Sequence, residues 1–135
     1  MHLLEKTKGS SSPQLYLGTF ESRQVFSDGR FLEFADKLPA VIERLRDRFA
    51  YLPEEAIKRS IPPDDGLAEE VQGVREHGGK YELLSRTRRS IVDRLYYDYL
   101  RMRYPKAKVF CRGENQPVMF SQEGVVRAIL MPLRE

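Results

Sequence analysis

The chain has 135 residues, which fits one hydrophobic core, because a core usually serves about 100–150 residues before a chain splits into domains. Its 32% of charged residues predicts a heavily solvated surface around that core. A single cysteine, Cys111, excludes an internal disulfide and a cysteine-based metal site, and favours a reducing compartment. No run of residues has the length of a membrane span or the core of a signal peptide, so we expect a cytoplasmic protein without a membrane partner.

The net charge of +3 is unevenly distributed along the chain. Residues 1–80 hold 12 basic and 14 acidic residues, whereas residues 81–135 hold 11 basic and 6 acidic ones. Between residues 86 and 112 there are 9 basic and 2 acidic residues, which gives +7. The positive charge that could attract nucleic acid therefore belongs to one segment.

The first predicted element is a β-hairpin. Residues 1–13 are small, polar and without periodicity, which predicts a flexible tail ahead of one domain over residues 14–135. Residues 14–20 alternate in part between apolar and polar, and residues 30–34 are mostly apolar. The turn signal Ser27-Asp28-Gly29 lies between these two stretches and joins them as a hairpin.

A first amphipathic helix is predicted to begin at Asp36, a candidate N-cap. Pro39 is tolerated in its first turn, because the N–H groups there lack an intrahelical acceptor. The apolar residues that follow have the spacing of one buried helical face: Leu38, Val41, Ile42, Leu45, Phe49 and Leu52. Arg44 and Arg48 would then lie on the exposed face, and Pro53 interrupts the helix.

The middle of the chain contains the clearest break. Residues 54–61 predict one or two further helical turns, and residues 62–66 (PPDDG) predict a loop within one domain. Residues 67–76 have a sparse apolar stripe that fits either a helix or a surface strand. His77-Gly78-Gly79 ends this stretch.

The strongest helix signal begins at Ser85 and ends at Tyr104-Pro105. Six residues fall within an arc of roughly 140°, which predicts a core-facing stripe: Ile91, Val92, Leu95, Tyr96, Tyr99 and Met102. The remaining arc carries Arg86, Arg89, Asp93, Arg94, Tyr97 and Arg101.

Three short strands are predicted to close the chain, over residues 108–111, 117–120 and 125–130, with turn residues between them. Together the elements predict a small single α+β domain, in which two main amphipathic helices pack on a short-strand, mostly antiparallel sheet. The second helix and these three strands form its best-defined unit.

Catalytic and metal-binding patterns are missing from the sequence. His2 and His77 stand alone, and Asp64 and Asp65 have no third carboxylate at loop-ligand spacing. Cys111 lies in a predicted strand, where a small packing residue is the expected role. We therefore expect a protein that is not an enzyme and that uses no metal ion or cofactor.

The basic helix is the better functional candidate. Its arginines could contact phosphates, and Tyr97 among them could stack on a base. The alternative is a solvated face in which i,i+4 pairs such as Arg89–Asp93 and Arg94–Asp98 neutralise part of the charge. The sequence leaves both possibilities open.

The last third of the chain resembles a known family. Residues 116–120 (QPVMF) and 125–134 (VVRAILMPLR) resemble the last two strands and the tail of the bacterial DNA polymerase III β sliding clamp. Residues 106–112 fall where the preceding strand of that family lies, residues 91–95 (IVDRL) where its helix lies, and residues 78–83 could match the strand before it. This chain has room for one domain where a clamp has three, and Arg88-Arg89-Ser90 replaces the Phe-Asn pair that usually opens the helix.

The resemblance implies two interfaces. Clamp helices face DNA, which would give a phosphate-contacting role to the arginines of both predicted helices: Arg44, Arg48, Arg89, Arg94 and Arg101. The clamp tail helps to form a groove for peptides of partner proteins, which would make Met131, Pro132, Leu133 and Arg134 partner-binding. The alternative for the tail is that Ile129, Leu130 and Leu133 finish the core.

The function expected from the sequence is a non-enzymatic nucleic-acid-binding module that uses an arginine-rich helix, in a replication, repair or phage-type setting. Its contacts would come from Arg86, Arg89, Arg94, Tyr97 and Arg101, with Arg44 and Arg48. The alternative is a protein-interaction or inhibitor module that docks a partner through its sheet or its C-terminal tail.

Overall fold

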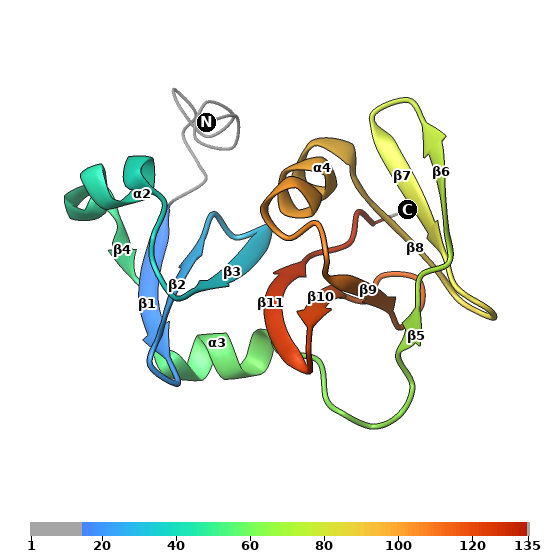
Figure 1. Cartoon of the computed structure of the whole chain (residues 1–135), viewed down its shortest axis with the longest axis horizontal. Helices are drawn as coiled ribbons and strands as arrows, with labels where there is room; N and C mark the ends of the chain where they lie inside the picture. Colours follow the sequence, from blue (N-terminus) through green and yellow to red (C-terminus); the bar gives the residue numbers. More distant parts are fainter. Residues whose placement is uncertain (1–14, 135) are drawn as a thin grey trace. The chain divides into compact units, whose positions relative to one another are not determined.

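The computed structural model describes residues 15–134 and is dominated by β-strands (Figure 1). Strands hold 41% of the described residues and helices 21%, and the three α-helices among them are short. The predicted α+β domain with two main helices on a sheet is therefore wrong. The chain divides into two compact units, of which one ends at Ile61 and the other begins at Pro62, where the sequence showed its clearest break. The predicted tail over residues 1–13 lies outside the described residues.

The first unit is built on two consecutive hairpins rather than the one predicted. Strands β1 (Tyr16–Phe20), β2 (Arg23–Ser27) and β3 (Phe31–Ala35) pair antiparallel in that order. The turn between β1 and β2 consists of Glu21 and Ser22, whose φ angles of 49° and 67° are positive. Sequence inspection missed this turn, because Asn and Gly are the residues that usually mark such a backbone.

The helix predicted from Asp36 breaks up after one turn. The structure has α2 (Ala40–Arg44), the 3₁₀ turn η1 (Arg46–Arg48) and strand β4 (Ala50–Tyr51). The backbone extends because β4 pairs in parallel with β1, and the Ala50 N–H donates to the Leu15 carbonyl at 2.8 Å. Tertiary strand pairing here overrides a helical apolar pattern, as it often overrides local propensity.

Close contact between β1 and the chain after β4 requires a glycine. A Cβ atom on Gly18 would lie 2.4 Å from the carbonyl oxygen of Leu52. Helix α3 (Glu54–Ser60) follows, as the sequence predicted, and contacts β1. Its Ile57 is fully buried.

The second unit contains two sets of strands. One runs in the order β11 (Val125–Leu130), β10 (Val118–Gln122), β9 (Lys108–Cys111), β5 (Glu69–Glu70), with the three predicted closing strands all present. The other is a three-stranded antiparallel sheet of β6 (Gly73–His77), β7 (Lys80–Leu84) and β8 (Arg89–Asp93). The ambiguous stretch over residues 67–76 is thus strand and not helix.

Helix α4 (Arg94–Arg103) is shorter than the helix predicted from Ser85. Residues 89–93 form β8 instead, with Ser90 and Val92 buried on one face. The predicted core stripe is correct for Tyr96 and Tyr99, which are buried. It is wrong for Leu95 and Met102, which are 42% and 74% exposed, because the helix starts later and buries another face.

No helix in the described part of the chain is long and apolar enough to cross a lipid bilayer.

Candidate nucleic-acid interface

The seven predicted nucleic-acid-binding residues fall into three groups. Arg86 and Arg89 belong to the β7–β8 hairpin, and α4 carries Arg94, Tyr97 and Arg101. Arg44 and Arg48 belong to the first unit, on α2 and η1. The first two groups were predicted to lie on one helix. In the structure Arg89 is instead the first residue of strand β8, and α4 begins after that strand.

An N-cap at Asp93 sets the start and direction of α4. Its carboxylate accepts hydrogen bonds from the N–H groups of Leu95 at 2.9 Å and Tyr96 at 3.4 Å. These donors have no acceptor within the helix, so the cap stabilises the first turn. Asp93 was predicted as a surface charge within a longer helix, although an acidic residue ahead of a helical run is itself a capping signal.

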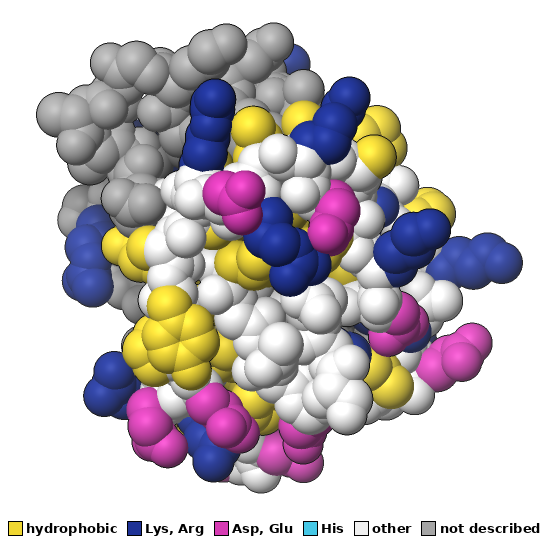
Figure 2. All heavy atoms as spheres, turned by 90° about the vertical axis from the view of Figure 1, so that its left-hand side faces the viewer, with side chains coloured by type: hydrophobic (Ala, Val, Ile, Leu, Met, Phe, Trp, Pro, Cys, Tyr) yellow, Lys and Arg dark blue, Asp and Glu magenta, His cyan; other side chains and the backbone are white. Residues whose placement is uncertain are grey.

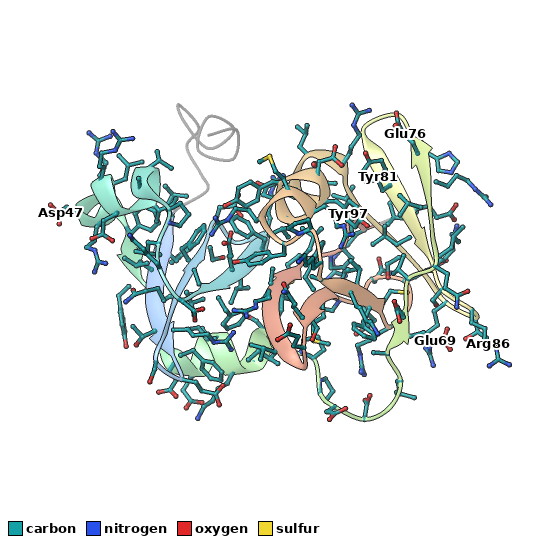
Figure 3. All side chains as sticks on the ribbon, viewed as in Figure 1. Asp47, Glu69, Glu76, Tyr81, Arg86 and Tyr97 are labelled. Carbon is teal, nitrogen blue, oxygen red and sulfur yellow. The ribbon has the colours of Figure 1, made fainter. Side chains whose placement is uncertain are left out.

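Tyr97 lies in the core of the second unit. Its ring meets the ring of Tyr81 edge-on at 5.3 Å between centroids and tilts against Phe120 at 5.6 Å (Figure 3). The residue is 9% exposed, and this burial raises the pKa of its hydroxyl. The structure thus leaves little of this ring for stacking on a base.

Arg94 joins α4 to the three-stranded sheet. Its guanidinium lies 2.9 Å from the Glu76 carboxylate on β6 and 3.9 Å from Asp98, one helical turn further along. Tyr81 donates its hydroxyl to both carboxylate oxygens of Asp98, at 3.0 and 3.2 Å, and this bond raises the pKa of the phenol. Arg94 keeps 41% of its side chain exposed, so it can contact a ligand as well.

Arg101 fixes the loop between α4 and β9. Its guanidinium donates to the carbonyl oxygens of Ala107 at 2.6 Å and Pro105 at 3.4 Å. No carboxylate among the described residues pairs with it. The arginine therefore retains its full positive charge while its orientation is set by the backbone.

Lys106 in this loop and Lys108, the first residue of β9, add two further positive charges. Lys106 and Lys108 are exposed, and neither forms an ion pair with a residue that the structure describes. Residues 94–108 contain five basic residues and one acidic residue, Asp98. We call Arg94, Arg101, Lys106 and Lys108 the α4 basic surface. The sequence analysis had assigned no role to the two lysines.

The arginines of the β7–β8 hairpin are largely neutralised. Arg89 forms ion pairs with Glu82 and with Glu114, the latter at 2.8 Å. Arg88 lies 3.8 Å from the Glu69 carboxylate and also donates to the backbone carbonyl of Arg112 at 2.9 Å. Arg86 is exposed in the turn, away from α4, and has no carboxylate partner within the described range (Figure 3).

Glu82 organises the outer face of the three-stranded sheet. Its carboxylate lies near Arg75 at 3.4 Å and His77 at 3.5 Å, besides its bond with Arg89. The Arg89 guanidinium is the main reason that the pKa of Glu82 is lowered. The basic side chains on this face therefore compensate the buried Glu82 carboxylate, which is a structural role.

Arg44 and Arg48 are exposed on a face of mixed charge. The neighbouring Arg46 pairs with Glu43 at 3.0 Å, and Asp47 lies between Arg46 and Arg48 in the chain. Figure 2 shows basic and acidic side chains interspersed on the face that carries α2 and β4. The first unit therefore presents no single-sign patch on that face.

The C-terminal tail is extended and partly buried. The Leu133 N–H donates to the Ile91 carbonyl at 2.8 Å, so the tail runs beside β8. Met131, Pro132 and Leu133 are half-buried and Arg134 is exposed, whereas Ile129 and Leu130 in β11 are fully buried. The tail thus both closes the core and keeps accessible side chains.

The described residues contain no group of histidine, cysteine and carboxylate side chains that could hold a metal ion. Cys111 is fully buried in β9, as a packing residue would be. Comparisons with protein-family models, with curated proteins and with solved structures found no match.

Proposed function

We propose that this chain is a non-enzymatic nucleic-acid-binding module that contacts backbone phosphates through the α4 basic surface. The observation that carries the proposal is the charge of residues 94–108, which contain five basic residues and one acidic residue, together with the absence of a carboxylate partner for both lysines in the described structure. Phosphate contacts of this kind release counterions from nucleic acid and supply affinity without reading its sequence.

The order of elements in the second unit supports a setting in replication, repair or phage biology. Strand β8, helix α4 and strands β9, β10 and β11 are followed by the Met131–Arg134 tail. The sliding-clamp resemblance anticipates a helix followed by three strands and this tail, and clamp helices face DNA; it does not anticipate β8, which holds residues 91–93 that the resemblance assigns to the helix. A module of this type holds DNA by charge and shape and performs no chemistry on it.

The contacts within the protein rank the candidate residues. Lys106 and Lys108 form no ion pair with residues 15–134 and Arg101 bonds to carbonyl groups, so their charges are available to phosphates. Arg94 shares its charge with Glu76 and Asp98. Arg89 is held by two carboxylates and should contribute least, since its charge is already compensated.

The proposal is tested by a double variant, Lys106→Ala with Lys108→Ala. At low salt we expect it to bind a fluorescent DNA or RNA oligonucleotide at least about 10-fold more weakly than the parent protein, because two phosphate contacts are lost. The control is Arg30→Ala with Lys37→Ala, which removes the same charge from exposed positions of the first unit. Equal losses in both variants, or no binding by the parent protein, would refute the proposal.

A second candidate is a protein-interaction or inhibitor module that docks a partner through its sheet or its tail. The observation that favours it is the half-buried tail, together with the exposed Leu95 and Met102 on α4. It predicts that removal of residues 131–135 abolishes capture of a partner protein, whereas the double lysine variant retains it. Retention after the truncation would exclude the tail.

A further inference from the structure

A cleft opens in the second unit where the chain passes from one sheet to the other. Strand β5 pairs with β9, and just beyond it the Val71 N–H still donates to the Val109 carbonyl at 2.7 Å. The next N–H, that of Gln72, donates to the Leu84 carbonyl on β7 at 2.8 Å. The chain thereby leaves the β9 edge, and a cleft of about 280 Å³ lies beside it.

Tyr97 contributes an unsatisfied donor to this cleft. The residue is 9% exposed and is part of the lining, with its ring held by Tyr81 and Phe120. Its hydroxyl makes no hydrogen bond with any residue between 15 and 134. Among the described residues the Arg88 Nε is the buried side-chain polar atom that lacks a partner, so the Tyr97 hydroxyl reaches solvent at the cleft and is accessible to a ligand.

Two cations line the same cleft. Lys108 has no ion-pair partner in the part of the chain that the structure describes, and the Arg101 guanidinium is oriented by its bonds to the Ala107 and Pro105 carbonyls. An oriented guanidinium needs little further ordering to hold an anion. Glu70 also lines the cleft but is exposed to solvent, where its repulsion of an anion is weakened.

The remaining walls combine the polar side chain of Gln72 with apolar side chains. The apolar side chains are chiefly those of Val71, Val74 and Val109. A volume of about 280 Å³ is at the lower limit for a drug-sized ligand. It suits a small group with one charged and one apolar part, such as a phosphate joined to a sugar.

We infer that this cleft holds one phosphate and its attached sugar from the bound nucleic acid. Lys108 and Arg101 neutralise the phosphate, the Tyr97 hydroxyl donates to one of its oxygens, and the valines contact the sugar. The contacts inferred here are to phosphate and sugar, which carry no sequence information directly. The inference rests on the proposed function and identifies one anchoring point within it.

The test is Tyr97→Phe, which removes the hydroxyl and keeps the ring. We expect binding to an oligonucleotide to weaken about 5- to 10-fold, the effect of one lost hydrogen bond to a charged group. The control is Tyr51→Phe, which makes the same change at a residue that is 76% exposed in the first unit and should leave binding unchanged. Unchanged thermal stability of Tyr97→Phe would show that the loss is not due to unfolding.

A direct measurement separates this inference from the proposed function. In protein carrying ¹³C-labelled tyrosine, an oligonucleotide should shift the Tyr97 Cζ resonance while that of Tyr51 stays in place. If the oligonucleotide binds without that shift and Tyr97→Phe binds normally, the inference fails and the proposed function survives. If the oligonucleotide does not bind, both fail, and a Tyr97 shift with a glutamate-rich peptide would then assign the cleft to an acidic protein partner.

Discussion

At the scale of single residues, carboxylates decide how the cations of this protein are used. Glu82 and Glu114 bind Arg89, Asp65 binds Arg112 at 2.7 Å, and Glu76 binds Arg94. Each partner comes from a different element than its arginine. Because these ion pairs compensate several arginines, the effective surface charge of residues 86–112 is far smaller than the net charge of +7 counted along the sequence. The partners are distant in the chain, so residue spacing could not predict the pairs.

Glu69 shows how one carboxylate ties two elements together. It accepts hydrogen bonds from the Thr87 N–H at 2.8 Å, the Thr87 hydroxyl at 2.6 Å and the Ser85 hydroxyl at 2.8 Å. These donors, with the Thr87 hydroxyl first, lower the pKa of Glu69 from 4.5 to about 2. The carboxylate thus attaches β5 to the turn between β7 and β8.

This pKa shift predicts a pH dependence of stability. A lowered carboxyl pKa stabilises the folded state above the unfolded pKa, and this contribution disappears as the pH falls from about 4.5 towards 2. Glu69→Gln cannot ionise, so the difference in free energy of unfolding between parent and variant should shrink over that range. Urea titrations between pH 6 and pH 3 measure it, and a constant difference would contradict the assignment.

At the scale of elements, the sequence predicted those whose local signals agree with their tertiary partners. The three closing strands and α3 have turn or proline signals at their ends and were predicted within one or two residues. The two long helices were predicted incorrectly. Pairing of β4 with β1 and of β8 with β7 removes parts of both, and such long-range pairing is invisible in a helical apolar period.

The β1–β4 pairing makes a prediction about Gly18. Gly18→Ala should destabilise the protein by about 1–3 kcal/mol, because the new methyl would lie 2.4 Å from the Leu52 carbonyl oxygen and force β4 away from β1. Gly79→Ala is the matched control, since a Cβ there meets no atom within 4 Å. Chemical denaturation compares the two, and equal effects would mean that the β1–β4 contact is looser than the structure shows.

At the scale of the whole molecule, the interface proposed here lies in the segment that the sequence singled out, but its residues differ in part from those predicted. The local excess of basic residues singled out residues 86–112, which contain the α4 basic surface. The prediction assigned the contacts in part to Arg89 and Tyr97, which the structure places in ion pairs and in the core. The cleft could not be predicted, because it arises from a crossing of the chain between two sheets.

The most direct test of the account is the salt dependence of nucleic-acid binding by the unaltered protein. If the four residues of the α4 basic surface each contact a phosphate of duplex DNA, the logarithm of the association constant should fall linearly with the logarithm of salt concentration, with a slope of about −3 to −4 between about 50 and 200 mM. A slope near zero, or no binding at about 50 mM salt, would contradict the proposal that this surface binds nucleic acid.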